Sequence, residues 1–113
     1  MLSYQKLDVY QCAIQFLALA AVILGGLPRG YSFLADELKR ASISISQNIA
    51  EGVGKSTEAD KSRYWAIARG SAMECGAILD ACKVLKLANA DGLRKGSDLL
   101  ERIVSMLSKM MRI

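Results

Sequence analysis

Two short stretches of the sequence carry polar side chains whose types would suit acid–base or metal chemistry. The first holds four polar residues spaced four, four and three positions apart, which places them in one stripe on a helix: Arg40, Ser44, Asn48 and Glu51. The second supplies three candidate partners for that stripe: Arg69, Ser71 and Glu74. Two carboxylates that meet at an internal face of a helical bundle can transfer protons or bind metal ions.

The same residues also fit a structural role, and we favour that interpretation. Metal sites in helical bundles usually add histidine to their carboxylates, and this chain has none. Buried charges persist when they are paired, and their best-supported role is to fix how helices align. We therefore expect a structural polar network in which Arg40 and Arg69 are internal. We assign no catalytic, cofactor-binding or metal-binding residue, and we expect a protein that is not an enzyme and needs no cofactor.

Basic residues near the middle of the chain are the candidates for binding a nucleic acid. The four that we expect to be exposed are Lys39, Lys55, Lys61 and Arg63. Copies of such a patch in an oligomer would let weak phosphate contacts add up. The alternative is an ordinary solvated surface, because acidic residues lie among them. Tyr64 and Trp65 have rings on which bases could stack, although the spacing of Trp65 favours the core.

The composition indicates one all-helical domain spanning residues 1–113. Hydrophobic residues make up 52% of the chain, and it contains a single proline. Abundant alanine and leucine favour helices over strands. A chain this small and this apolar has more to bury than one core holds, which points to self-association. The net charge of +4 permits anionic partners without demanding them.

Cysteines and the apolar run near the start bear on location. The three cysteines show no disulfide framework, so we expect a reducing, cytoplasmic environment. The run of residues 16–24 resembles the core of a signal peptide, but the segment before it carries Asp8. The run is also shorter than the roughly 20 residues that span a bilayer. We therefore expect a buried helix and no membrane partner.

Apolar spacing predicts four helices at about residues 3–24, 32–51, 58–87 and 90–112. In the first, one apolar stripe runs from Leu7 to Leu24 in steps of three and four, and a second runs from Val9 to Ile23. The first stripe has the pattern of a bundle seam. A helix that is apolar on two faces packs on two sides, and in a monomer one of those sides would face water, which again points to oligomerisation. Gly52 is expected to end the second helix. Short connections then give an up-down-up-down four-helix bundle.

Several motifs resemble the family named for proteins encoded in intervening sequences of bacterial 23S ribosomal RNA. The matching segments are Leu7-Asp8-Val9-Tyr10, Arg40-Ala41, Ser44-Ile45, Asn48-Ile49-Ala50-Glu51-Gly52, Ser56, Arg63-Tyr64-Trp65 and Ala68-Arg69-Gly70-Ser71-Ala72-Met73-Glu74. The chain departs from the family pattern at Ser46-Gln47, where Pro-Ser is frequent. Without that proline the second helix should be straighter.

The resemblance implies a left-handed four-helix bundle that assembles as a ring-like homopentamer. It also implies similarity to an accessory protein of diversity-generating retroelements, a basic pentamer that binds a reverse transcriptase and nucleic acid. No catalytic residues are implied. Two functions therefore remain open: a non-enzymatic oligomeric module that binds RNA or DNA, with or without a protein partner such as a reverse transcriptase, and a scaffold for protein interactions with no nucleic-acid role.

Overall fold

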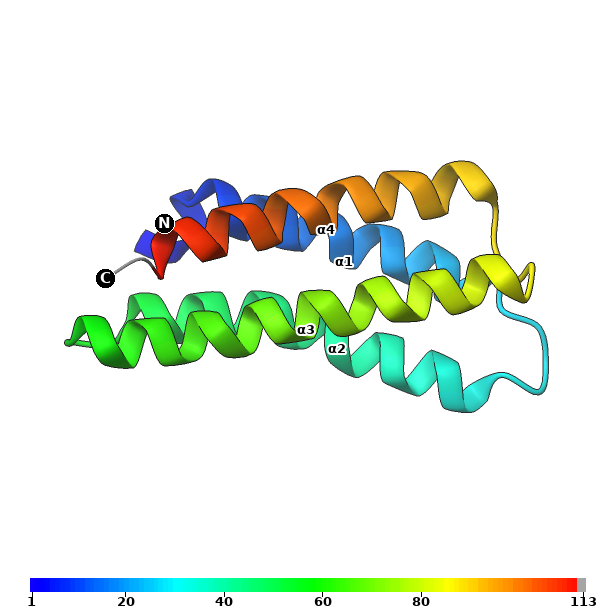
Figure 1. The fold of residues 1–113 in the computed structure, drawn as a ribbon, viewed down its shortest axis with the longest axis horizontal. Coiled ribbons are helices and arrows are strands. Elements are labelled where there is room, and N and C mark those ends of the chain that lie inside the picture. Colours follow the sequence, from blue (N-terminus) through cyan, green and yellow to red (C-terminus); the bar gives the residue numbers. More distant parts are fainter. Residues whose placement is uncertain (112–113) are drawn as a thin grey trace.

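The computed structural model describes residues 1–111, and these form one short 3-10 helix and four α-helices without strands. The elements are η1 (Ser3–Lys6), α1 (Asp8–Gly25), α2 (Ser32–Val53), α3 (Glu58–Val84) and α4 (Ala90–Met110). Consecutive α-helices run in opposite directions along the long axis (Figure 1). The all-helical prediction is confirmed.

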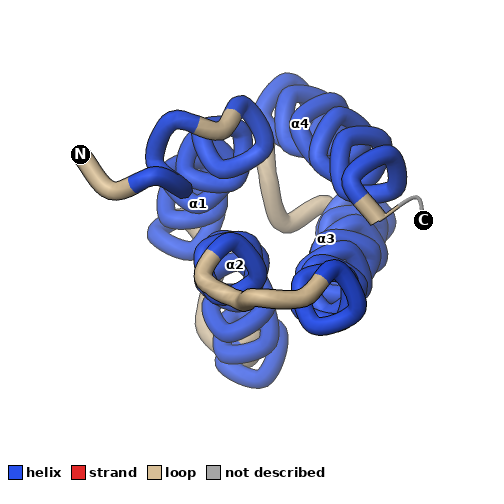
Figure 2. The backbone as a smooth tube through the Cα atoms, turned by 90° about the vertical axis from the view of Figure 1, so that its left-hand side faces the viewer, coloured by secondary structure: helices blue, strands red, loops and turns tan. Residues whose placement is uncertain are grey.

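The four long helices stand at the corners of a square when the molecule is viewed along its axis (Figure 2). Each helix packs on its two neighbours in the order α1, α2, α3, α4 and back to α1. Helices α1 and α3 occupy opposite corners and run in the same direction. Both chain ends and the α2–α3 connection lie at one end of the bundle, where α2 finishes and α3 begins.

The helix ends show which local signals set the bounds. The Thr57 hydroxyl accepts from the Asp60 amide at 3.1 Å and so caps α3. At the other end of α3, Lys86 adopts a left-handed backbone with φ of 57°, and the Leu87 amide donates to the Cys82 carbonyl at 2.9 Å. This pattern closes the helix three residues before the predicted end at 87. The predicted end of the last helix at 112 lies outside the described residues.

The start of the first helix was also predicted wrongly. Residues Ser3–Lys6 form the separate 3-10 turn, and Leu7 has an extended backbone with ψ of 134°. The α-helix begins only at Asp8, whose carboxylate suits the positive end of the helix dipole. The apolar spacing continues smoothly across Leu7, so periodicity alone could not reveal this break.

Helices α1, α3 and α4 each turn one apolar line toward the core. On α3 this line runs from Trp65 to Cys82 in steps of three and four, and on α4 it consists of Leu93, Leu100, Ile103 and Leu107. In α1 the buried line is the second stripe: Val9, Ala13, Phe16, Ala20 and Ile23. The stripe chosen as the seam is at most half-buried, and Ile14 within it is exposed. Both stripes are equally apolar, which is why spacing could not separate them.

Gly52 lies inside α2 and does not end it. The helix continues to Val53, and Gly54 is the capping residue. A Cβ atom on Gly52 would lie 2.3 Å from Nε1 of Trp65, a distance that no packing tolerates. The Trp65 indole instead fills this space and donates its N–H to the Ile49 carbonyl oxygen at 3.3 Å. Gly52 is therefore required for close approach between α2 and α3.

Candidate nucleic-acid interface

Three of the four candidate cations gather where α2 ends and α3 begins. Lys55 lies in the short connection, Lys61 in the second turn of α3, and Arg63 two residues further on. The Lys55 ammonium lies 4.9 Å from the centre of the Tyr64 ring, and the Arg63 guanidinium lies 4.8 Å from it. Tyr64 therefore holds two cations beside its electron-rich ring, as cation–π contacts do.

Lys61 is anchored to the end of α2. Its ammonium donates to the Val53 carbonyl oxygen at 3.1 Å. The last carbonyls of a helix lack partners within the helix and carry the negative end of its dipole, so a lysine there stabilises the helix end. Two of the three ammonium hydrogens stay available to another acceptor. Lys61 thus combines a structural role with a position beside the other two cations.

Lys55, Lys61 and Arg63 form a basic cluster, and acidic side chains nearby offset part of its positive charge. The Glu51 carboxylate lies 3.6 Å from the Lys55 ammonium across one turn. Glu58 and Asp60 are in the first turn of α3, where they suit the helix dipole. η1, which includes Lys6, and the last turn of α4, which includes Lys109, lie at the same end of the bundle (Figure 1). The end is therefore mixed in charge.

Lys39 is separate from the other candidates. It lies in the second turn of α2, and its side chain is exposed. From there to the end of α2 at Val53 the helix rises about 20 Å. The four predicted residues therefore do not form one patch: three gather at the bundle end and Lys39 lies along the side.

The polar stripe predicted from spacing lies along the outer junction of α2 and α3. Arg40 forms an ion pair with Glu74, and the Ser44 and Ser71 hydroxyls hydrogen-bond at 2.8 Å. The Asn48 amide donates to the Ser44 hydroxyl at 3.0 Å and, more tightly, to the carbonyl of the same residue at 2.8 Å. These pairs are arranged in antiparallel order along the two helices.

The expectation that both arginines are internal is wrong. The Arg40 side chain is 60% exposed and that of its partner Glu74 is 36% exposed. Arg69 is half-buried, and its guanidinium donates to the Ser108 hydroxyl of α4 at 3.1 Å. The sequence did not predict this partner on α4, because Ser108 lies outside both motifs. The exposed Arg40–Glu74 pair can align α2 with α3 at little desolvation cost, while the Ser44–Ser71 pair lies deeper, with Ser71 buried.

The two glutamates considered above as a catalytic pair, Glu51 and Glu74, are far apart. Glu74 pairs with Arg40, and Glu51 is eleven residues further along α2, a rise of about 16 Å. A shared proton or a bridged ion needs the two carboxylates within a few ångströms. Within residues 1–111, no three His, Cys, Asp or Glu side chains come close enough to hold a metal ion.

The buried thiols have no chemistry in common with this surface. Burial, and to a smaller extent the neighbouring Glu74 carboxylate, raises the pKa of the Cys75 thiol from 9.0 to about 12. The Arg40 guanidinium lowers this pKa, but by less. Burial also raises the pKa of Cys82. A thiol with a raised pKa is protonated at neutral pH and is a poor nucleophile. These cysteines are packing residues.

The comparison with family models agrees with the motifs. The model described as 23S rRNA-intervening sequence protein matches residues 5–109, so the chain belongs to that family. No curated protein matches the chain. The family description links the chain to RNA by name, and the matched range includes every residue of the basic cluster and the polar stripe.

Proposed function

We propose that this member of the 23S rRNA-intervening sequence protein family is a non-enzymatic, homo-oligomeric module that binds nucleic-acid phosphates. The observation that carries the proposal is the gathering of three cations at one end of the bundle: Lys55 and Arg63 lie beside the Tyr64 ring, and Lys61 is held on the last turn of α2. Three cations so close together can contact successive phosphates.

A single cluster of this kind is weak. Acidic neighbours offset part of its charge, and each phosphate contact contributes little at physiological salt. Oligomerisation would strengthen the binding. The resemblance to pentameric relatives implies a homopentamer, which would present five clusters on one side of the assembly. Linked sites bind as one multivalent surface and gain effective concentration without any new contact.

A binding experiment with matched variants tests the nucleic-acid proposal. Fluorescence anisotropy of labelled structured RNA and duplex DNA at low salt should show binding by the wild-type protein. The double variant Lys55→Gln/Arg63→Gln should bind at least tenfold more weakly. The matched control is Lys83→Gln/Arg94→Gln, which removes the same two charges from the opposite end of the bundle and should change affinity by less than threefold. Equal losses in both variants would indicate a general charge effect and no defined site.

A second function is favoured by the mixed charge of the basic end. Glu51, Glu58 and Asp60 lie among the cations, as they would on a surface that meets another protein. In this alternative the protein is a scaffold with no nucleic-acid role. Absence of binding to both probes at low salt, with the oligomer intact, would favour the scaffold.

A further inference from the structure

A polar hollow lies where α2 ends, beside the basic cluster, and we call it the α2-end pocket. Its volume is about 680 Å³, and its lining comes from the last two turns of α2, the connection and α3: Gln47, Asn48, Ala50, Glu51, Gly54, Lys55 and Tyr64. All of these except the alanine and the glycine have polar side chains. Small-molecule sites have volumes of about 300–1,000 Å³, so the pocket has room for a nucleotide-sized ligand.

Three of the lining residues form a row along the end of α2: Asn48, Glu51 and Lys55. Asn48 and Glu51 are three residues apart on the helix, so their side chains are neighbours. The Lys55 ammonium lies 3.6 Å from the Glu51 carboxylate. The pocket therefore presents an amide, a carboxylate and an ammonium in that order.

The Asn48 amide is held so that its oxygen is the atom available to a ligand. Its nitrogen donates to the Ser44 carbonyl oxygen at 2.8 Å and to the Ser44 hydroxyl at 3.0 Å. A carbonyl oxygen only accepts hydrogen bonds, so the nitrogen must be the atom that faces Ser44. The Asn48 Oδ1 atom faces the other way, and no group within residues 1–111 donates to it. Asn48 thus offers an acceptor to a ligand in the pocket.

The row accepts hydrogen bonds at its first two positions and donates at the third. The Watson–Crick edge of guanine carries the complementary groups in the same order: the 2-amino group, the N1–H group and the O6 oxygen. Adenine and cytosine each place a ring-nitrogen acceptor at the centre of this edge, where the Glu51 carboxylate needs a donor. Uracil has the central N–H group but lacks the amino group. Guanine is therefore the base that fits the row.

This edge of guanine is free only in an unpaired nucleotide, because base pairing uses the same groups. Phosphate alone does not suit the row, since the Glu51 carboxylate repels it. Phosphates on either side of the base have cations nearby. Lys55 and Arg63 lie 4.9 and 4.8 Å from the centre of the Tyr64 ring, which also lines the pocket.

We propose that the α2-end pocket binds the guanine base of an unpaired nucleotide. The Glu51 carboxylate accepts from N1–H and from one hydrogen of the 2-amino group. The Asn48 Oδ1 atom accepts from the second hydrogen of that group, and the Lys55 ammonium donates to O6. This inference rests on the proposed function, because the basic cluster holds the neighbouring phosphates, and it adds a base preference to that function.

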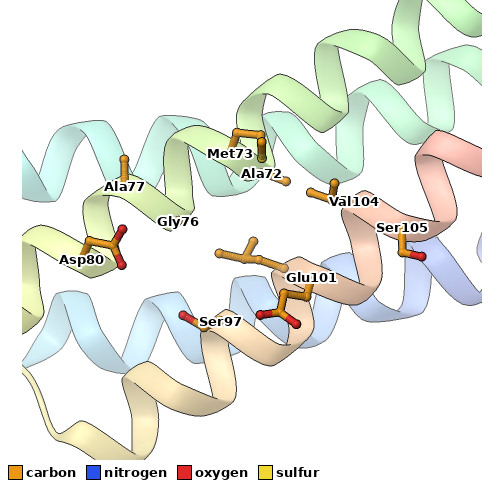
Figure 3. A pocket seen from close by; sticks show the side chains of 10 residues that line it. Ala72, Met73, Gly76, Ala77, Asp80, Ser97, Glu101, Val104 and Ser105 are labelled. Carbon is orange, nitrogen blue, oxygen red and sulfur yellow. The ribbon is translucent and has the colours of Figure 1, made fainter.

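The groove between α3 and α4 lacks this combination of groups and supplies a control. Glu101 projects from α4 and Asp80 from α3 (Figure 3). The described residues that line the groove include no lysine or arginine, so no ammonium or guanidinium accompanies these carboxylates there. Replacing Glu101 by glutamine removes one negative charge from a hollow that does not match guanine.

Binding of short RNA strands with one variable base tests the pocket. Fluorescence anisotropy at low salt should show that the wild type binds UUUGUUU at least about fivefold more tightly than UUUAUUU, as expected of a base contact that pairs several groups. UUUIUUU, whose inosine lacks the 2-amino group, should bind at least about threefold more weakly than UUUGUUU. Both comparisons use the unaltered protein, so a folding defect cannot cause them.

Glu51→Gln should remove the preference and strengthen general binding. The ratio of the two affinities should fall below about twofold, because the amide has one acceptor oxygen where the carboxylate has two. Affinity for UUUAUUU should rise, because a negative charge beside the phosphates is gone. Glu101→Gln should keep the guanine preference of the wild type. Circular dichroism melts check that both variants are folded.

The outcomes separate the pocket from the broader proposal. If the wild type binds both heptamers equally while Lys55→Gln/Arg63→Gln binds both more weakly, the basic cluster stands and the pocket is wrong. If Glu51→Gln binds both heptamers more tightly and keeps the guanine preference, Glu51 acts through its charge alone and the pocket is wrong. If neither heptamer nor duplex DNA binds at low salt, the proposed function is wrong and the pocket with it.

Competition with guanosine monophosphate identifies the source of the base. Displacement of labelled UUUGUUU by this nucleotide at concentrations similar to those of the unlabelled heptamer would support the pocket, with a free nucleotide as its ligand. Displacement that requires an excess of about 100-fold or more would support the pocket as part of a strand-binding site, because the phosphates of a strand add further contacts. Equal displacement by guanosine and adenosine monophosphates would contradict the pocket.

Discussion

At the scale of single residues, Gly52 is the glycine with the least room for a side chain, because Trp65 lies against it. The motif Asn48-Ile49-Ala50-Glu51-Gly52 ends at a glycine, which the sequence suggested was a helix stop. The structure shows instead that the missing side chain makes room for the indole of the neighbouring helix. A close-approach glycine and a helix-ending glycine look the same in a sequence, because only the neighbouring helix distinguishes them.

Replacing Gly52 with alanine should lower the free energy of unfolding by about 2 kcal/mol or more, because the added methyl overlaps the rigid Trp65 ring. The matched control is Gly92→Ala in the first turn of α4, where a Cβ meets nothing within 4 Å. That variant should be neutral or more stable by up to about 1 kcal/mol, as helix propensity predicts. Urea denaturation of both would measure this, and equal stabilities would contradict the packing role of Gly52.

The Arg40–Glu74 pair should contribute little to stability. Both side chains are partly exposed, and such ion pairs are worth about 0–1 kcal/mol. A double-mutant cycle of Arg40→Ala and Glu74→Ala should give a coupling energy below about 1 kcal/mol that shrinks in 1 M salt. A coupling energy near 3 kcal/mol would instead indicate the internal network expected from the sequence. Spacing placed these residues on one line correctly, but it carries no information on how deep that line lies.

The Cys75 thiol should make stability depend on alkaline pH. Its folded pKa of about 12 exceeds the ordinary value of 9.0, so the native state holds the proton more tightly than the unfolded state. The resulting stability is complete below pH 9 and is lost as the pH rises toward 12. Between pH 8 and pH 10.5 the wild type should lose about 2 kcal/mol more than Cys75→Ala, which lacks the thiol. Parallel losses in the two proteins would contradict the raised pKa.

At the scale of helices, local signals explain the starts of α3 and α4 well. Asn89 precedes α4, and its side-chain oxygen accepts from the amides of Asp91 at 2.7 Å and Gly92 at 3.2 Å. Asn89→Ala should therefore lower stability by about 1 kcal/mol, while Asn89→Asp should keep most of it. Thermal melts of the two variants would measure the difference. If Asn89→Ala melts with the wild type, the cap is not a source of stability.

Helix α1 shows where sequence reasoning reached its limit. Two apolar stripes were visible, and the need for two packing partners followed from them. Which stripe faced the core was predicted wrongly, because Leu7, Leu17 and Leu24 are as apolar as the residues that are buried. The charged surfaces of α2 and α4 were readable from the sequence. The outer surface of α3 could not be predicted, because its small residues have the same spacing as the residues of a packing seam.

At the scale of the whole molecule, the basic cluster lies at one end of the bundle, beside the connection between α2 and α3 (Figure 1). In the proposed homo-oligomer, copies related by a rotation axis parallel to the bundle would gather their basic ends on one side. Helix spacing alone already places Lys39 about 20 Å along α2 from the cluster. The approach of Lys55 and Arg63 to the Tyr64 ring could not be predicted, because it depends on how the connection between the two helices folds.

The measurement that tests this account most directly is the salt dependence of duplex DNA binding by the wild type and by Lys55→Gln/Arg63→Gln. Three phosphate contacts from one cluster give a slope of log affinity against log salt concentration of about −2.7. In the proposed homo-oligomer several clusters engage one duplex, so the wild type should show a slope steeper than this. The double variant loses two cations from each cluster and should show a shallower slope than the wild type. Absence of binding at low salt, or binding by the wild type that salt does not weaken, would contradict the account.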